Sequence, residues 1–114
     1  SIVHQKGFEG AGVYSATKGA LRAYARVLTT ELAPRKIRVN AVAPGPIGTP
    51  IYSKMDGITQ EQVSEMGENF AQNVPLQRFG EAQEVAKAVT FLTGDAASYI
   101  NGIELEVDGG MSQI

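Results

Sequence analysis

Residues 13–45, VYSATKGALRAYARVLTTELAPRKIRVNAVAPG, decide the fold, because a long helical pattern is followed there by a short apolar run. Small or apolar residues recur at steps of three and four over residues 13–33, which predicts a helix that Pro34 ends. Residues 37–43 are rich in valine and alanine and precede a Pro-Gly-Pro turn, which favours a buried strand. A helix that leads into a buried strand is typical of α/β proteins.

Three further elements are predicted downstream. Thr59 stands three residues before a glutamine, the spacing of a capping box, which predicts a helix over 60–72. An apolar stripe closed by Gly94 predicts a second helix over 81–93. Strict alternation of apolar residues with glutamates predicts a strand over 103–107, with one face on the core and the other toward water or a partner.

The order strand, helical crossover, strand indicates a right-handed parallel unit. Two strands cannot cover three amphipathic helices, so we expect the remaining strands in another chain or in a segment before Ser1. Residues 44–58 contain three prolines and three glycines and are expected to lack regular structure. Residues 1–12, which hold three glycines among polar residues, are expected to form a loop.

Composition limits the possible functions. Of 114 residues, 43% are apolar and 19% are charged, which argues for a folded chain. The net charge of -2 makes nucleic acid an unfavourable partner. No apolar stretch approaches the ~18 residues that cross a bilayer, so we expect no membrane contact and a soluble, cytoplasmic protein. With no cysteine and a single histidine, His4, neither a thiolate site nor a histidine-based metal site is expected.

Tyr14 and Lys18 are the first candidate site residues. They are four apart at the start of the predicted helix, so their side chains share a face. A nearby ammonium favours phenolate over phenol, which suits a side chain that gives and takes a proton. The alternative is a tyrosine packed on its own helix beside a solvated lysine.

The segment from Pro44 to Thr49 is the second candidate, because it follows a predicted buried strand. Ligands bind outside the carboxyl ends of strands in open α/β sheets. Gly45 would let a flat ring approach the backbone, the prolines would fix the loop, and Thr49 offers a hydroxyl. An ordinary strand-to-loop transition is the alternative.

Taken in order, these residues resemble the short-chain dehydrogenase/reductase family, and the resemblance covers essentially all 114 residues. Ser1, thirteen positions before Tyr14, matches the family's catalytic serine, and residues 14–18 match its Tyr-x-x-x-Lys motif. Residues 40–49 are similar to its cofactor loop. Further matches are at residues 78–80, 84–86, 98–100 and 107–110.

The resemblance implies an α/β fold that is the carboxyl-terminal part of a Rossmann-like, doubly wound parallel sheet, incomplete in this chain. Residues 1–114 would be the catalytic and substrate half of one NAD(P)-binding domain, without its amino-terminal dinucleotide-binding half. It also implies a dimer or tetramer built through the long helix and the last strand.

The resemblance further implies a reaction. Tyr14 would be the acid/base in hydride exchange between NAD or NADP and a carbonyl or secondary alcohol. Lys18 would activate Tyr14 and bind the nicotinamide ribose, and Ser1 would hold the reacting oxygen. The residues implied to bind the cofactor are Tyr14, Lys18, Pro44, Gly45, Ile47 and Thr49.

The family's glycine-rich turn, its residue selecting NAD or NADP and a helix-borne asparagine would all precede Ser1. We therefore expect this chain alone to be inactive. Two other readings stay open. One is a truncated, non-catalytic interaction module that associates through its long helix and last strand, and the other is a binding domain that keeps Tyr14 and Lys18 only by descent.

Other polar residues are expected to have ordinary roles. His4 lies in a polar stretch and is expected to be solvated or merely hydrogen-bonded. Glu104 and Glu106 are expected to share a solvent-facing side of their strand. Asp108 is expected to cap a turn. The residues weighed as a substrate lid, against plain helix packing, are Met55, Met66 and Phe70.

Overall fold

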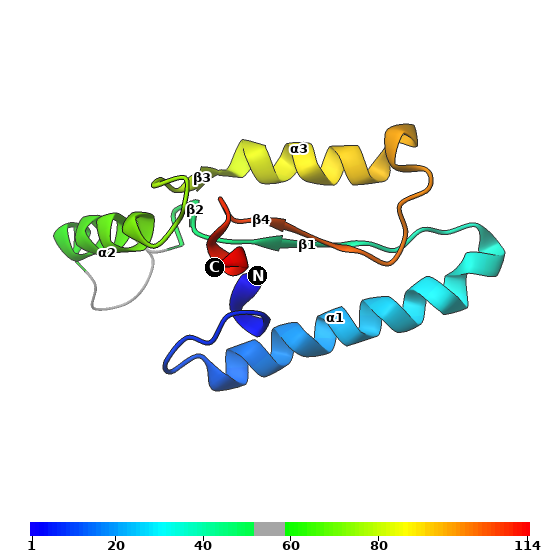
Figure 1. Ribbon diagram of the computed structural model, residues 1–114, viewed down its shortest axis with the longest axis horizontal. Helices are drawn as coiled ribbons and strands as arrows, with labels where there is room; N and C mark the ends of the chain where they lie inside the picture. Colours follow the sequence, from blue (N-terminus) through cyan, green and yellow to red (C-terminus); the bar gives the residue numbers. More distant parts are fainter. Residues whose placement is uncertain (52–58) are drawn as a thin grey trace.

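The computed structural model describes residues 1–51 and 59–114 and has three helices around two short parallel ribbons (Figure 1). The helices are α1 (Gly12–Leu32), α2 (Gln60–Gln72) and α3 (Ala82–Thr93). The strands are β1 (Ala41–Pro44), β2 (Ile47–Gly48), β3 (Gly80–Glu81) and β4 (Glu104–Val107). Short 3-10 turns are η1 (Ile2–His4), η2 (Ala33–Arg35), η4 (Asp95–Ala97) and η5 (Met111–Gln113).

The principal ribbon lies between two helices, so both of its faces are covered. Strands β1 and β4 are parallel, with Ala41 opposite Glu104 and Pro44 opposite Val107. Helix α1 runs along one face and α3 along the other, while α2 lies beyond the ends of the strands (Figure 1). This α/β arrangement with parallel strands is the predicted fold class.

The three helix predictions are confirmed within one residue at each end. The Thr59 hydroxyl accepts from the Gln62 backbone N–H at 3.2 Å, and the Gln62 side chain accepts from the Thr59 N–H at 2.9 Å. This reciprocal cap is the one that the sequence predicts for α2. Pro34 stands two residues after the end of α1 and is the second residue of η2.

The strands are shorter than predicted at their amino-terminal ends. The predicted strand over 37–43 begins only at Ala41. Before each strand begins, a backbone N–H group donates to an asparagine side chain and not to the backbone of the neighbouring strand. The Val39 N–H donates to the Asn101 side-chain oxygen at 2.8 Å, and the Ile103 N–H donates to that of Asn40 at 3.2 Å. These bonds replace ladder bonds, so β1 begins four residues later than predicted and β4 begins one residue later.

Two segments expected to be irregular contain regular structure. Ile47 pairs with Gly80 to make the parallel β2–β3 pair inside the stretch expected to be a loop. Two residues are too few to show a period-two pattern, so the sequence carried no signal for this pair. The amino-terminal stretch also contains the turn η1, which the Ser1 side chain caps by accepting from the Val3 N–H at 3.4 Å.

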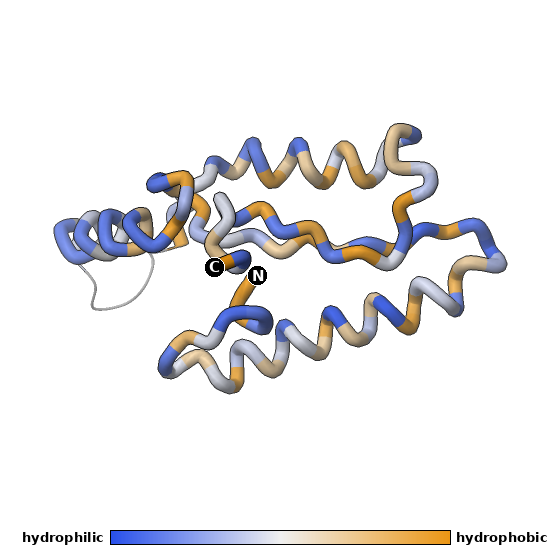
Figure 2. Tube along the Cα trace, viewed as in Figure 1, coloured by the Kyte–Doolittle hydropathy of each residue, from blue (hydrophilic) through white to orange (hydrophobic). Residues whose placement is uncertain are grey.

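The core is small and α1 contributes little to it. Its buried residues are Ile2, Ala43, Val74 and Met111, with Phe8 and Phe70 packed against them. Within the described part of the chain, α1 has no buried residue, and its apolar side chains at least half exposed are Val13, Tyr14, Leu21, Tyr24 and Val27. Figure 2 shows apolar and polar residues alternating along this helix. None of the helices in residues 1–51 and 59–114 has the length and apolarity that crossing a bilayer requires.

Candidate functional site

A cavity of about 630 Å³ gathers every residue that the sequence singles out as catalytic or cofactor-binding. It is walled by side chains from η1, α1, the β1–β2 connection, α2, α3 and η5. The predicted site residues that line it are Ser1, Tyr14, Lys18, Pro44, Gly45, Ile47 and Thr49. The structure therefore brings together three segments that are separate in the sequence.

Tyr14 and Lys18 lie on one face of α1, as their spacing predicts. The Lys18 ammonium nitrogen is 5.2 Å from the centroid of the Tyr14 ring. At that distance a cation is attracted to the ring face. The two residues are four positions apart, so Lys18 lies one helical turn after Tyr14 on α1.

Ser1 reaches the same cavity from η1. The turn is tied to α1, because the Ser15 hydroxyl donates to the Val3 carbonyl oxygen at 2.5 Å. Since Ser15 follows Tyr14 directly, this bond sets where η1 sits relative to the phenol.

The loop from Pro44 to Thr49 is held on both sides by neighbouring strands. The Gly45 N–H donates to the Val107 carbonyl at 3.0 Å, and the Gly80 N–H donates to the Pro46 carbonyl at 3.0 Å. A Cβ at Gly45 would stand 2.6 Å from the Cβ of Asp108, so this position requires glycine. The glycine thus serves a close approach to Asp108, which follows β4, and its role beside a flat ring stays a prediction.

Asp108 caps the turn after β4, as predicted. Its carboxylate accepts from the backbone N–H groups of Gly110 and Ser112, each at 2.8 Å. Burial disfavours the charged form, but the hydrogen bonds from Ser112 and Gly110 prevail and hold the pKa of Asp108 below its usual value. The turn carries Met111, a buried residue that also lines the cavity.

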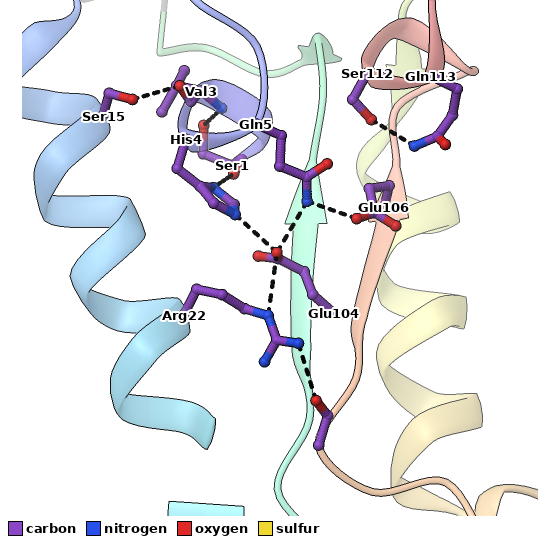
Figure 3. Close-up of polar contacts among 11 residues, drawn as sticks. Ser1, Val3, His4, Gln5, Ser15, Arg22, Glu104, Glu106, Ser112 and Gln113 are labelled. Carbon is purple, nitrogen blue, oxygen red and sulfur yellow. Dashed lines mark hydrogen bonds and ion pairs between the residues drawn. The ribbon is translucent and has the colours of Figure 1, made fainter. Parts of the chain in front are cut away.

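The prediction that Glu104 faces solvent is wrong. Its side chain is 11% exposed, and its Oε2 atom lies 2.8 Å from His4 Nε2 and 3.5 Å from Arg22 Nε (Figure 3). Alternation of apolar and polar residues predicts a solvent-facing side only where one face of the sheet is exposed to solvent. Here α1 covers the face of the ribbon that carries Glu104. Glu106, on the same face, accepts from the Gln5 amide at 2.6 Å.

His4 is hydrogen-bonded, which confirms one half of its prediction, and with a side chain 12% exposed it is not solvated. Arg22, which pairs with Glu104 beside the cavity, is a residue that the sequence reasoning missed. It follows Tyr14 and Lys18 by further steps of four on α1, and that spacing could have placed it on their face.

The cavity also has an apolar wall that the sequence indicated only in part. Phe70, weighed as a lid residue, does line it, and so do Phe8 and Met111 from near the two ends of the chain. Met55 and the side chain of Met66 lie outside the described residues. Their lid role therefore stays a prediction.

Comparisons with known proteins agree with this arrangement. A family model described as enoyl-(acyl carrier protein) reductase matches residues 1–112. The chain is 47% identical to a rat 3-oxoacyl-[acyl-carrier-protein] reductase over 97% of its length and 42% of the relative's. It is 45% identical to the human protein of that name over the whole chain and 43% of the relative. The chain thus spans about two fifths of these curated relatives.

Two solved structures have the same backbone arrangement. A small-chain dehydrogenase crystallised in complex with NADPH superposes with a TM-score of 0.88 at 32% identity, over 100% of this chain and 49% of that one. A putative betaketoacyl-ACP reductase superposes with a TM-score of 0.82 at 38% identity, over 100% and 45%. By the family model and by these relatives, the chain belongs to the short-chain dehydrogenase/reductase family.

Proposed function

We propose that this chain forms the catalytic half of an NAD(P)-dependent oxidoreductase that interconverts a carbonyl compound and a secondary alcohol. One observation carries the proposal: Ser1, Tyr14, Lys18 and the loop over 44–49 line a single cavity. No one of these features is specific alone. A proton donor, a cation beside it, a second hydroxyl and a rigid ring-binding loop are together what this chemistry needs.

Each side chain has a role that its position supports. Tyr14 gives a proton to the carbonyl oxygen in reduction and takes one from the alcohol in oxidation. Lys18, 5.2 Å from the Tyr14 ring centroid, stabilises the phenolate after the proton has left. The Ser1 hydroxyl donates to the reacting oxygen and holds it in line with Tyr14.

The cavity fits the nicotinamide end of a dinucleotide. The Lys18 ammonium can bind ribose hydroxyls, Ile47 offers an apolar surface for the ring, and the Thr49 hydroxyl can meet the carboxamide. When bound, NAD or NADP supplies or accepts the hydride. The NADPH complex of a solved relative supports this cofactor class, and the names of the reductase relatives support a carbonyl substrate.

The dinucleotide's other end needs residues that this sequence does not contain. A Gly-x-Gly-x-x-Gly turn is absent from all 114 residues. We therefore propose that activity requires an amino-terminal half like the one the longer relatives carry, and that this chain alone does not turn over. We call the chain together with such a half the completed protein. Its cytoplasmic location remains a prediction.

Association is part of the proposal. The exposed apolar side chains of α1, among them Leu21, Tyr24 and Val27, favour a homodimer or homotetramer that covers this helix. The same exposure supports the second candidate function, a non-catalytic module that binds a partner through α1 and β4.

The Tyr14→Phe variant of the completed protein tests the proposal. It is expected to bind NADPH like the parent protein and to lose turnover of carbonyl substrates by about 10²–10⁴-fold, the usual share of a general acid. Tyr24→Phe is the matched control, because Tyr24 lies on the same helix with its side chain outside the cavity. Unchanged turnover in Tyr14→Phe would remove Tyr14 from the mechanism, whereas a completed protein that shows no turnover even with Tyr14 in place would favour the non-catalytic module.

A further inference from the structure

A polar cluster beside the cavity joins the two ends of the chain and stands outside the set of residues assigned above. It consists of His4, Gln5, Arg22, Glu104 and Glu106 (Figure 3). We propose that His4, braced by Glu104, is a positioning residue that sets the place of Ser1 against Tyr14. The inference rests on the proposed function, because it concerns the serine that would hold the reacting oxygen.

His4 connects the backbone of Ser1 to strand β4. Its Nδ1 lies 2.9 Å from the Ser1 carbonyl oxygen, and its Nε2 lies 2.8 Å from Oε2 of Glu104. The His4 ring thus has a hydrogen-bonding oxygen beside each of its two nitrogens. The ring therefore bridges residues a hundred positions apart in the sequence.

Glu104 is a fixed anchor for this bridge. Its Oε2 atom also accepts from the Gln5 amide at 3.0 Å and pairs with Arg22 Nε at 3.5 Å. Arg22 in turn donates through Nη2 to the Gly102 carbonyl at 3.1 Å. The side chains of His4, Glu104 and Arg22 are only 12%, 11% and 16% exposed, so solvent competes little for these contacts.

The register of the ribbon explains how the carboxylate reaches η1. Glu104 pairs with Ala41 on β1, and the methyl side chain of alanine leaves the space above β1 open. The longer Glu104 side chain crosses that space toward His4 (Figure 3).

Side-chain hydrogen bonds therefore connect η1 and its cap Ser1 to two other elements, α1 and β4. The Ser15 hydroxyl holds the Val3 carbonyl to α1, and His4 holds the Ser1 carbonyl to β4. We expect these two hydrogen bonds to limit where the Ser1 hydroxyl lies relative to the phenol of Tyr14. Loss of the His4 contact removes a hydrogen bond from the Ser1 carbonyl, and small displacements of a reacting group slow a reaction strongly.

Kinetics of the completed protein test this role through a double-mutant cycle. His4→Gln is expected to lower kcat about tenfold, while KM and the NADPH dissociation constant change less than about twofold. Ser1→Ala is expected to lower kcat about a hundredfold. In the Ser1→Ala background, His4→Gln is expected to cause no further loss, since it acts through the serine.

Two matched substitutions on β4 distinguish a positioning role from a general effect on stability. Glu104→Gln is expected to reproduce the kinetic pattern of His4→Gln, because it removes the charge that braces the ring. Glu106→Gln, two residues along the same strand face, contacts Gln5 and is expected to leave kcat unchanged. Thermal unfolding of each variant, measured beside the kinetics, reports any loss of folding.

The outcomes distinguish the positioning role of His4 from the proposed function. Parent-like kcat in His4→Gln, or an equal loss with and without the Ser1 hydroxyl, would overturn the positioning role while leaving the proposed function intact. Parent-like turnover in both Ser1→Ala and Tyr14→Phe would overturn the proposed function and the positioning role with it. Loss of kcat in His4→Gln that vanishes in the Ser1→Ala background supports both.

Discussion

Replacement of Gly45 by alanine should move the loop over 44–49 away from Val107 of β4. The new Cβ would stand 2.6 Å from the Asp108 Cβ and 2.7 Å from its Cα, closer than such atoms approach in proteins. Neither atom can rotate away, so the loop must move and the 3.0 Å bond from the Gly45 N–H to the Val107 carbonyl is strained or lost. Overpacking costs about 1–3 kcal/mol and a lost hydrogen bond about 1 kcal/mol. We expect the free energy of unfolding to fall by about 2–4 kcal/mol.

Urea unfolding of the completed protein, followed by circular dichroism, measures this loss, and titration with NADPH measures the accompanying loss of affinity. Gly48→Ala is the matched control, because a Cβ there would meet only the Gly80 carbonyl oxygen at an ordinary 3.8 Å. It should change the stability by less than about 1 kcal/mol. A Gly45→Ala variant with parent-like stability and NADPH affinity would refute the close-packed loop.

Two other perturbations probe the site and the turn beneath it. Lys18→Met should reduce kcat of the completed protein at least about tenfold, since it removes the cation beside Tyr14; parent-like kcat at neutral pH would exclude that role. Asp108 has a lowered pKa, so its contribution to stability is complete above the pKa of an unfolded aspartate, about 4, and is lost as the pH falls through the folded value. The urea midpoint of Asp108→Asn should therefore lie below that of the parent at pH 7 and approach it near pH 3, whereas a gap of equal size at both pH values would contradict the assignment.

The local elements could be predicted because their signals are local. Helix α1 follows from a 3.6-residue pattern stopped by a proline, and α2 follows from its capping box. The spacing of Tyr14 and Lys18 predicts a shared helix face, and the structure has it. The meeting of this face with the loop over 44–49 followed only from the family resemblance, since spacing says nothing about contacts across a sheet.

The polar cluster could not be predicted for the same reason. Glu104 alternates with apolar residues and so looks solvent-facing, but the ribbon carries a helix on each face. His4 stands in a glycine-containing stretch whose partner is a hundred residues away. In α1, Arg22 continues the four-residue steps of Tyr14 and Lys18, which is the one local hint of the cluster.

The place of the nicotinamide ring tests the central claim most directly. A crystal structure of the completed protein with NADP⁺ is expected to show the ring between the Tyr14 hydroxyl and the loop over 44–49, with the Lys18 ammonium on the ribose. A ring bound elsewhere, with Tyr14 and Lys18 away from the cofactor, would contradict the account.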